Sequence, residues 1–299
     1  MSNETLLTKI DKYSKSYISE KKSLNCSINT ITAYSYVLDS FYEYIVEFDS
    51  IVGLEDISKE VILSFLNKES NSSINTKVLR LAVLKSFFIY LDEKEGLNGI
   101  FELRFKKLTI KKEDKEVEAL SESEVQRLLA LFDKPSKSFN KNRDALLIKI
   151  ILFTGIRASE CLNVRLQEMS LLEEDGVYKI KVLGKGNKER YVYIAVDKIQ
   201  RELDFLKNYI VDYIAITNQN KPMSRVGLYG VISNKMKKAL INKKGVHILR
   251  HTFARNLVAK NINLATISEL LGHADITLTA RTYAKSDEGS KIRAVTSIF

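Results

Sequence analysis

The chain has 299 residues, with 47 Lys and Arg against 37 Asp and Glu, a net charge of +10, and enough hydrophobic residues (45%) for a core of normal size. Two Pro and 12 Gly disfavour collagen-like, low-complexity and turn-rich all-β proteins, and two Cys disfavour a disulfide scaffold or a thiolate metal site. The N-terminus lacks the pattern of a signal peptide and no apolar run could span a bilayer, so we expect a soluble cytoplasmic protein without membrane contact.

The first part of the chain, residues 1–104, has the pattern of a small all-α domain of four or five short helices. Apolar residues recur at three- and four-residue steps in the expected helices, and the residues from Ser27 can cap the first of them. The expected helical segments are Leu24–Glu47 with a cap at Ser27, Ser58–Asn67, and the stretch from Ser73 to Leu91. Gly96 and Gly99 are expected to end this block.

Residues 105–118 are charged and lack helical periodicity, which indicates a linker between two domains; a solvated loop within one domain is the alternative. The charge changes across this segment. Residues 1–110 hold 14 basic and 15 acidic residues (net −1), whereas residues 220–299 hold 14 and 4 (net +10). A polyanion that binds the C-terminal part is the simplest interpretation, and a solubilising surface is the other.

The second domain, residues 119–299, is expected to be mainly α with a small antiparallel sheet, so the whole chain is mainly α with an α+β second domain. Ser121 and Glu124 resemble a helix start. Further elements follow in order: an apolar helix Asp144–Phe153 ending at Thr154-Gly155, strands Val177–Leu183 and Tyr191–Ala195 around the turn Gly184–Lys188, and helices from Lys198 onward broken at Pro222, Gly245 and Gly272.

Three groups of residues can do chemistry. His247, Arg250 and His251 have the spacing of one helical face, although polar residues that cap or pack under a helix would show it too. Arg157 follows an apolar helix and a glycine turn, so it must be paired or aimed at a ligand, and Glu160 can hold it. Lys185 can extend freely from a hairpin turn.

In order along the chain, Thr154–Glu160 (TGIRASE), the Gly-Lys-Gly turn at Lys185, His247–His251 (HILRH), Leu271-Gly272-His273 and then Tyr283 resemble the tyrosine recombinase (phage integrase) family. The resemblance covers both domains, because the first domain is similar to that family's helical core-binding domain. It departs from many relatives in one respect: Tyr283 lies ten residues after His273, where nine is common. Taken singly, Tyr283 would pass for a half-buried core tyrosine.

The resemblance implies a role for each matching residue. Arg157 and Arg250 would clamp the scissile phosphate, and His247 and His273 would contact the phosphate and assist the nucleophile. Lys185 would protonate the leaving 5′ oxygen, and Tyr283 would be the nucleophile. Glu160 and His251 would have supporting roles, with His251 the most structural of the three histidines.

The implied reaction is a transesterification. Tyr283 attacks a DNA phosphate, forms a 3′-phosphotyrosyl bond and frees a 5′-OH. A 5′-OH of a partner duplex then attacks the phosphotyrosyl bond and reverses this step. The bond energy stays in the protein–DNA link, so the resemblance implies neither ATP nor metal nor any other cofactor.

The implied partners are duplex DNA and further copies of the chain. DNA contacts are expected from basic residues in both domains, namely Lys77, Arg80, Lys85, Lys188, Arg190, Lys235, Lys237, Lys238, Lys243 and Lys244. The apolar end of the tail Lys291–Phe299 could fold back on its own core or, as in the family, dock into a neighbour to close a dimer or cyclic tetramer on DNA. An accessory activator protein is a further expected partner.

Two other functions remain open from the sequence. A type IB topoisomerase would use similar chemistry, and a DNA-binding relative could bridge sites without cutting. Within the recombinases, the two-domain length favours a Xer-like enzyme that resolves chromosome or plasmid dimers, or a compact integrase of a mobile element.

Overall fold

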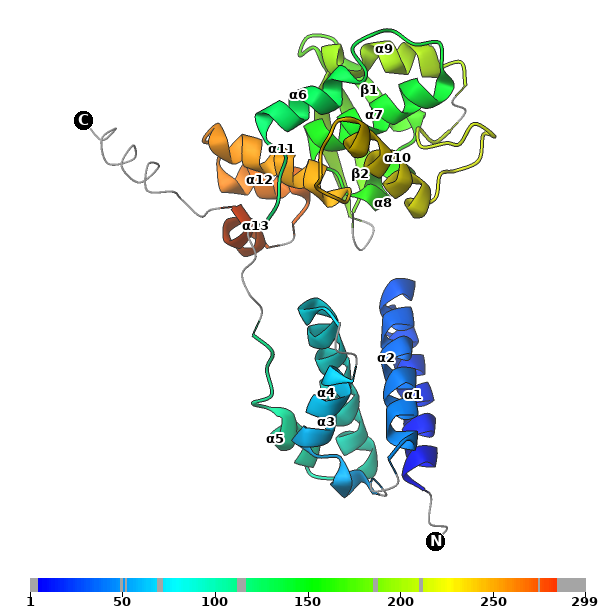
Figure 1. Cartoon of the computed structure of the whole chain (residues 1–299), viewed down its shortest axis with the longest axis vertical. Coiled ribbons are helices and arrows are strands. Elements are labelled where there is room, and N and C mark those ends of the chain that lie inside the picture. Colours follow the sequence, from blue (N-terminus) through cyan, green and yellow to red (C-terminus); the bar gives the residue numbers. More distant parts are fainter. Residues whose placement is uncertain are drawn as a thin grey trace, which may run out of the picture. The chain divides into compact units, whose positions relative to one another are not determined.

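The computed structural model describes residues 5–48, 51, 53–68, 72–111, 117–184, 188–209, 212–273 and 275–283. The chain divides into two compact units, Met1–Lys115 and Glu116–Phe299 (Figure 1). None of the helices in the described ranges is long and apolar enough to cross a membrane.

The first unit is all helical within its described residues. Its elements are α1 (Leu6–Ser23), α2 (Ile28–Val46), the 3₁₀ turn η1 (Leu54–Asp56), α3 (Lys59–Asn67), α4 (Ile74–Glu95) and α5 (Ile100–Phe105). A hydroxyl side chain accepts a hydrogen bond from the first turn of each of α1 to α4; the four caps are Thr5, Ser27, Ser58 and Ser73. The helix starts expected after the three serines are thereby confirmed.

Helix α5 continues the fold beyond the two glycines that were expected to end it. Gly96 and Gly99 adopt left-handed conformations (φ +65° and +76°) and turn the chain between α4 and α5. The Asp92 carboxylate then caps α5 by accepting hydrogen bonds from the amides of Phe101 and Glu102 at 2.9 and 3.0 Å. Phe101 is itself buried in the aromatic core of this unit.

Phe105, the first residue of the expected linker, also packs in that core. Its ring centroid lies 5.5 Å from that of Phe88 on α4, in an edge-on contact. Phe105 is 3% exposed, and Leu108 and Ile110 pack against the same cluster. The apolar residues of this charged segment are therefore held by the first unit.

The second unit contains eight α-helices, one 3₁₀ turn and one sheet among its described residues. They are α6 (Glu122–Ala130), α7 (Phe139–Thr154), α8 (Ala158–Asn163), η2 (Leu166–Glu168), β1 (Met169–Leu172), β2 (Val177–Leu183), β3 (Glu189–Ala195), α9 (Val196–Leu206), α10 (Arg225–Lys238), α11 (His247–Ala259), α12 (Leu264–Leu271) and α13 (Ile276–Tyr283). The sheet is antiparallel in the order β1-β2-β3. Together the two units have the mainly α fold with a small sheet that the sequence predicts.

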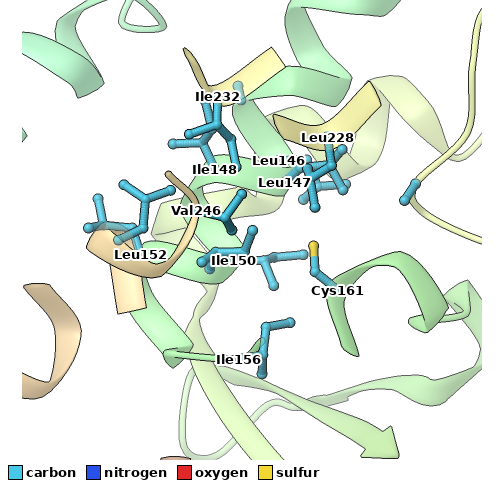
Figure 2. Packing of buried hydrophobic residues seen from close by; sticks show 14 of the residues in the cluster. Leu146, Leu147, Ile148, Ile150, Leu152, Ile156, Cys161, Leu228, Ile232 and Val246 are labelled. Carbon is cyan, nitrogen blue, oxygen red and sulfur yellow. The ribbon is translucent and has the colours of Figure 1, made fainter. Parts of the chain in front are cut away.

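Helix α7 forms the centre of the second unit's core. Leu146, Leu147 and Ile148 are fully buried although consecutive residues of a helix point about 100° apart. A helix that is apolar on every side must be enclosed, and Figure 2 shows residues of α7 among Leu228 and Ile232 of α10 and other buried side chains. The end of α7 is therefore a rigid point from which the following residues project.

The hairpin of β2 and β3 contains the segment in which the sequence places Lys185. Val177 pairs with Ala195 and Leu183 with Glu189, and the Gly184 amide donates to the Lys188 carbonyl at 2.8 Å. Strand β3 begins two residues earlier than expected and so includes Arg190. Strand β1 was not predicted, because its four residues lack an alternating buried pattern.

Candidate active site

Two helices that end at left-handed glycines bring the candidate residues together. Gly155 follows α7 (φ +67°) and Gly272 follows α12 (φ +65°). A Cβ on Gly155 would lie 2.4 Å from the Phe253 ring, and one on Gly272 would lie 2.8 Å from the Arg190 guanidinium carbon. Both positions therefore require glycine, and the close approach that it allows places the residues following α7 and α12 in one site.

Glu160 of α8 binds two arginines at once. Its Oε1 accepts from Nη1 of Arg157 and from Nη1 of Arg190, both at 2.8 Å, and its Oε2 accepts from Nη2 of Arg190 at 2.9 Å and from the Arg157 amide at 2.7 Å. Burial alone would raise the pKa of this carboxyl, but the hydrogen bonds from Arg190 and from the Arg157 backbone outweigh it and leave the pKa below its usual value. Glu160 is thus ionised and fixes Arg157.

Three arginines converge on the C-terminal end of α12. Arg190 Nε donates to the Leu270 carbonyl at 3.2 Å, Arg250 Nη2 to the Leu271 carbonyl at 2.8 Å, and Arg157 Nη2 to the Gly272 carbonyl at 3.0 Å. These carbonyls lie at the negative end of the helix dipole. The end of α12 therefore offsets part of the positive charge of the site.

Arg250 is the most enclosed of these arginines. It is 5% exposed, and its Nη1 donates to the Gly155 carbonyl at 2.7 Å. Burial and the neighbouring Arg157 lower its pKa to about 10, so that it still carries its charge near neutral pH. Arg250 thus links the turn after α7 to the turn after α12, with a permanent charge between them.

His273 has both ring nitrogens engaged. Nε2 lies 2.9 Å from Arg250 Nη2, and Nδ1 lies 2.7 Å from Thr279 Oγ1 on α13. Because a guanidinium only donates, Nε2 must accept, and the ring proton then resides on Nδ1 and is donated to Thr279. Burial and Arg250 lower the pKa of His273 to about 4, in agreement with a neutral ring.

His247 and His251 lie one turn apart on α11, with ring centroids 6.4 Å apart. His247 is exposed at the start of the helix, and partial burial together with Arg250 lowers its pKa. His251 is half-buried, and its Nδ1 lies 2.5 Å from the Tyr283 hydroxyl. Tyr283 is 8% exposed at the end of α13.

The structure thus brings together Arg157, Glu160, Arg250 and His273, and it joins His251 to Tyr283. Lys185 lies outside the described residues, which resume at Lys188 on the same turn. The residues of the tail from Ala284 to Phe299 lie outside them as well.

The basic residues expected to bind DNA differ in their surroundings. Arg80 is 3% exposed with its guanidinium over the Phe65 ring, so this buried side chain is not placed to meet a phosphate. Arg190 is held by Glu160, Lys235 binds Asp144 at 3.0 Å, and Lys243 binds Glu124 at 2.6 Å. Lys188, Lys237, Lys238 and Lys244 are exposed, and Lys77 and Lys85 are half-buried.

Two participants were not recognised from the sequence in the roles that the structure indicates. Arg190 was expected to bind DNA, whereas in the structure it forms hydrogen bonds with Glu160. Thr279 was assigned no role, whereas it binds Nδ1 of His273. Their partners lie far away in the chain or across a turn, so spacing alone does not reveal them. One available signal was the acid at Glu160, since a single buried carboxylate can accept from more than one arginine.

Replacing Glu160 with Gln is expected to destabilise the second unit by about 3 kcal/mol, because two guanidiniums lose their ionised partner. The pKa of Glu160 is lowered in the folded chain, so its contribution is present at neutral pH and is lost as pH falls through that lowered pKa. Urea unfolding of both proteins at pH 7 and near pH 3 measures this. The control is Glu122→Gln, because Glu122 is exposed. If both changes lowered the free energy of unfolding equally at pH 7, the contacts of Glu160 with the two arginines would not stabilise the unit.

Comparison with known families and proteins identifies the family of the chain. Residues 118–289 match the Phage integrase family, and residues 10–95 match the Phage integrase, N-terminal SAM-like domain. The tyrosine recombinase XerH of Campylobacter jejuni subsp. jejuni serotype O:2 is 32% identical over 282 residues, covering 89% of this chain and 78% of that protein. The tyrosine recombinase XerD of Staphylococcus saprophyticus is 32% identical over 168 residues, covering 52% and 55%.

Solved structures agree. A post-cleavage complex of the XerH site-specific recombinase with a palindromic difH substrate has a TM-score of 0.77 and 27% identity, covering 93% of this chain and 82% of that one. Its pre-cleavage complex with difH has a TM-score of 0.73 and 26% identity, covering 93% and 81%. The chain belongs to the phage integrase family, whose tyrosine recombinases cleave and rejoin DNA strands.

Proposed function

We propose that this chain is a site-specific recombinase that cuts and rejoins duplex DNA through a 3′-phosphotyrosyl link to Tyr283. The observation that carries the proposal is the convergence of Arg157 and Arg250 on the C-terminal end of α12, since two guanidiniums can contact the oxygens of one phosphate. The match to the phage integrase family supports DNA as the source of that phosphate.

Each residue of the proposed site acts through its charge or its proton. Arg157 and Arg250 bind the scissile phosphate and stabilise the extra negative charge of its transition state. His247, exposed at the start of α11, donates to a phosphate oxygen. Lys185 protonates the leaving 5′ oxygen. Bond energy is conserved in the phosphotyrosyl link, so the proposed reaction proceeds without ATP or metal.

The proposed function is tested with the DNA that the protein itself selects. Sequencing of the duplexes that the purified chain retains from a random pool gives its site, and a nicked suicide duplex of that site traps the covalent complex. A recombinase becomes covalently attached and joins two such sites. Relaxation of supercoiled DNA without site preference would indicate a topoisomerase, and binding without attachment would indicate a protein that only bridges DNA.

The selected site also separates the two biological roles that we propose. The XerH structure contains a palindromic difH substrate, and by analogy a palindrome of roughly 30 base pairs suits two copies related by a two-fold axis. Such a site near a replication terminus would support resolution of chromosome or plasmid dimers, which would place the protein in the cytoplasm with the DNA. Sites at the ends of a mobile element would support integration and excision instead.

Exposed lysines supply the proposed grip on the DNA backbone. If 6–10 phosphates are neutralised, affinity falls roughly 10³–10⁵-fold between 50 and 200 mM salt. Replacing both Lys237 and Lys238 with Ala is expected to reduce the slope of log affinity against log salt by about 2. Lys243→Ala is the control, because Lys243 is already paired with Glu124. Equal slopes in the double variant and the wild type would remove these lysines from the interface.

Assembly on DNA is proposed to involve the C-terminal tail, with an accessory activator as a further partner. Deleting residues 288–299 is then expected to weaken cooperative assembly on a full site more than binding to a half-site, because docking into a neighbour needs two copies. Band-shift titrations on both duplexes measure this. If the two affinities fell equally, the tail would belong to its own core instead.

A further inference from the structure

The hydroxyl of Tyr283 meets a histidine that the proposed phosphate site does not use. His251 Nδ1 lies 2.5 Å from Tyr283 Oη, and the ring centroids are 5.8 Å apart. Tyr283 is 8% exposed, so water has little access to the phenol. The contact is therefore a specific hydrogen bond between two side chains.

The position of the pair follows from the packing of three helices. His251 comes directly after Arg250 on α11, and consecutive helical residues point about 100° apart. Arg250 can thus reach the ends of α7 and α12 while His251 reaches α13. Tyr283 packs in a small core with Ala254 of α11 and Ile267 of α12. Apolar packing within the protein holds the phenol beside His251 without DNA.

The protonation states of the pair are set by burial and by nearby cations. Burial raises the pKa of Tyr283 to about 12 against the opposing effect of Arg250, so the phenol keeps its proton. Burial, His247 and Arg250 lower the pKa of His251 to about 4, so the imidazole is neutral. With such a pKa only about one phenol in 10⁵ is ionised at pH 7. Attack at neutral pH therefore requires a group that takes the proton as the bond forms.

The titratable groups on the helices that pack against α11 leave His251 as that acceptor. Besides Tyr283 on α13, the groups that act on its charge are His247 and Arg250 on its own helix. On α7, Asp144 and Lys149 are held by Lys235 and Glu202, and on α12 Glu269 is exposed. His273 is excluded as acceptor because both of its nitrogens are engaged.

We propose that His251 is a further catalytic residue, the general base that accepts the proton of Tyr283 during DNA cleavage. The proposal rests on the proposed function. As Tyr283 Oη bonds to phosphorus, its proton passes to His251 Nδ1 and the bond from phosphorus to the 5′ oxygen breaks. The leaving oxygen takes a proton from Lys185. In the rejoining step a 5′-OH attacks phosphorus and gives its proton to the Lys185 amine, the bond from phosphorus to Tyr283 Oη breaks, and the imidazolium returns its proton to the phenolate oxygen.

A substrate with sulfur in place of the bridging 5′ oxygen isolates this step. A thiolate leaves without protonation, since thiols have pKa values near 8.5, so the rate no longer depends on Lys185. The measurement is the single-turnover rate of covalent attachment to a suicide duplex of the selected site, between pH 6 and 9. The proteins are the wild type, His251→Ala, His251→Asn and, as control on the exposed face of the same helix, Asn256→Ala.

The wild type and Asn256→Ala should show a nearly flat pH profile. His251→Ala should be about 100-fold slower at pH 7 and should gain close to tenfold in rate for each pH unit, because it must wait for phenolate. His251→Asn keeps a hydrogen-bond acceptor near the position of Nδ1 but cannot take a proton at these pH values. It should resemble His251→Ala in both respects.

Three outcomes would overturn the proposal. A flat profile in His251→Ala would mean that another group takes the proton. Recovery of the wild-type rate in His251→Asn would mean that His251 only positions the phenol. A fold-loss of duplex affinity equal to the fold-loss of rate, or a fall in thermal stability that accounts for the lost rate, would assign His251 a structural role. Failure of the wild type itself to attach would instead refute the proposed function, so the two failures are distinct.

Discussion

Replacing Tyr283 with Phe is expected to abolish covalent attachment to a suicide duplex while duplex binding persists. The phenylalanine ring fills the same small core with Ala254 and Ile267, so α13 should stay in place. The change removes the oxygen that would form the phosphotyrosyl bond and leaves His251 without its partner. Denaturing gels detect the adduct and band shifts measure binding.

The matched control is Tyr209→Phe. Tyr209 is 46% exposed and stacks on Phe205, so losing its hydroxyl should change neither attachment nor binding. An adduct formed by Tyr283→Phe would exclude Tyr283 as the nucleophile.

Replacing Arg250 with Lys is expected to slow covalent attachment at least 100-fold. A single ammonium cannot reach the Gly155 and Leu271 carbonyls and His273 in the forked geometry of a guanidinium. Burial and Arg157 lower the pKa of Arg250 already, and an ammonium at this place would lose its proton far more readily. The variant should therefore lose charge as well as geometry.

Arg255→Lys is the control for this change, because Arg255 is exposed on the same helix and a lysine there keeps its charge. Single-turnover rates and band shifts on the same duplex compare the two. Arg250→Lys should bind DNA with affinity close to that of the wild type, since one of many phosphate contacts is altered. Attachment at the wild-type rate would show that Arg250 does not contact the reacting phosphate.

Local signals in the sequence predicted much of the fold. Ser27, Ser58, Ser73 and Ser121 cap helices because a hydroxyl and the amides that it binds lie within four residues of one another. Strand β2 has the bounds expected from its alternation. The residues brought together around Arg250 were also named beforehand, but from the order of motifs rather than from any contact.

What the sequence did not predict depends on contacts between distant residues. Helix α5 forms because Asp92 caps it and Phe105 packs against the ring of Phe88. From the sequence, the two glycines before α5 indicated only the end of the helical block. Arg80 shows the same limit: its place on α4 looked suitable for a phosphate, yet neighbouring helices bury it. Charge and spacing cannot show which side of a helix the core will cover.

The three arginines at the end of α12 have a consequence for the cost of binding. Guanidiniums that converge without an anion repel one another, yet here Glu160 and the helix carbonyls hold them in place before any phosphate arrives. Their side chains are thus ordered when the chain folds. In the proposed reaction, DNA would therefore lose little binding free energy in ordering them. Much of the entropy penalty of the proposed recognition would be met during folding, and a ligand as small as inorganic phosphate would find the site preorganised.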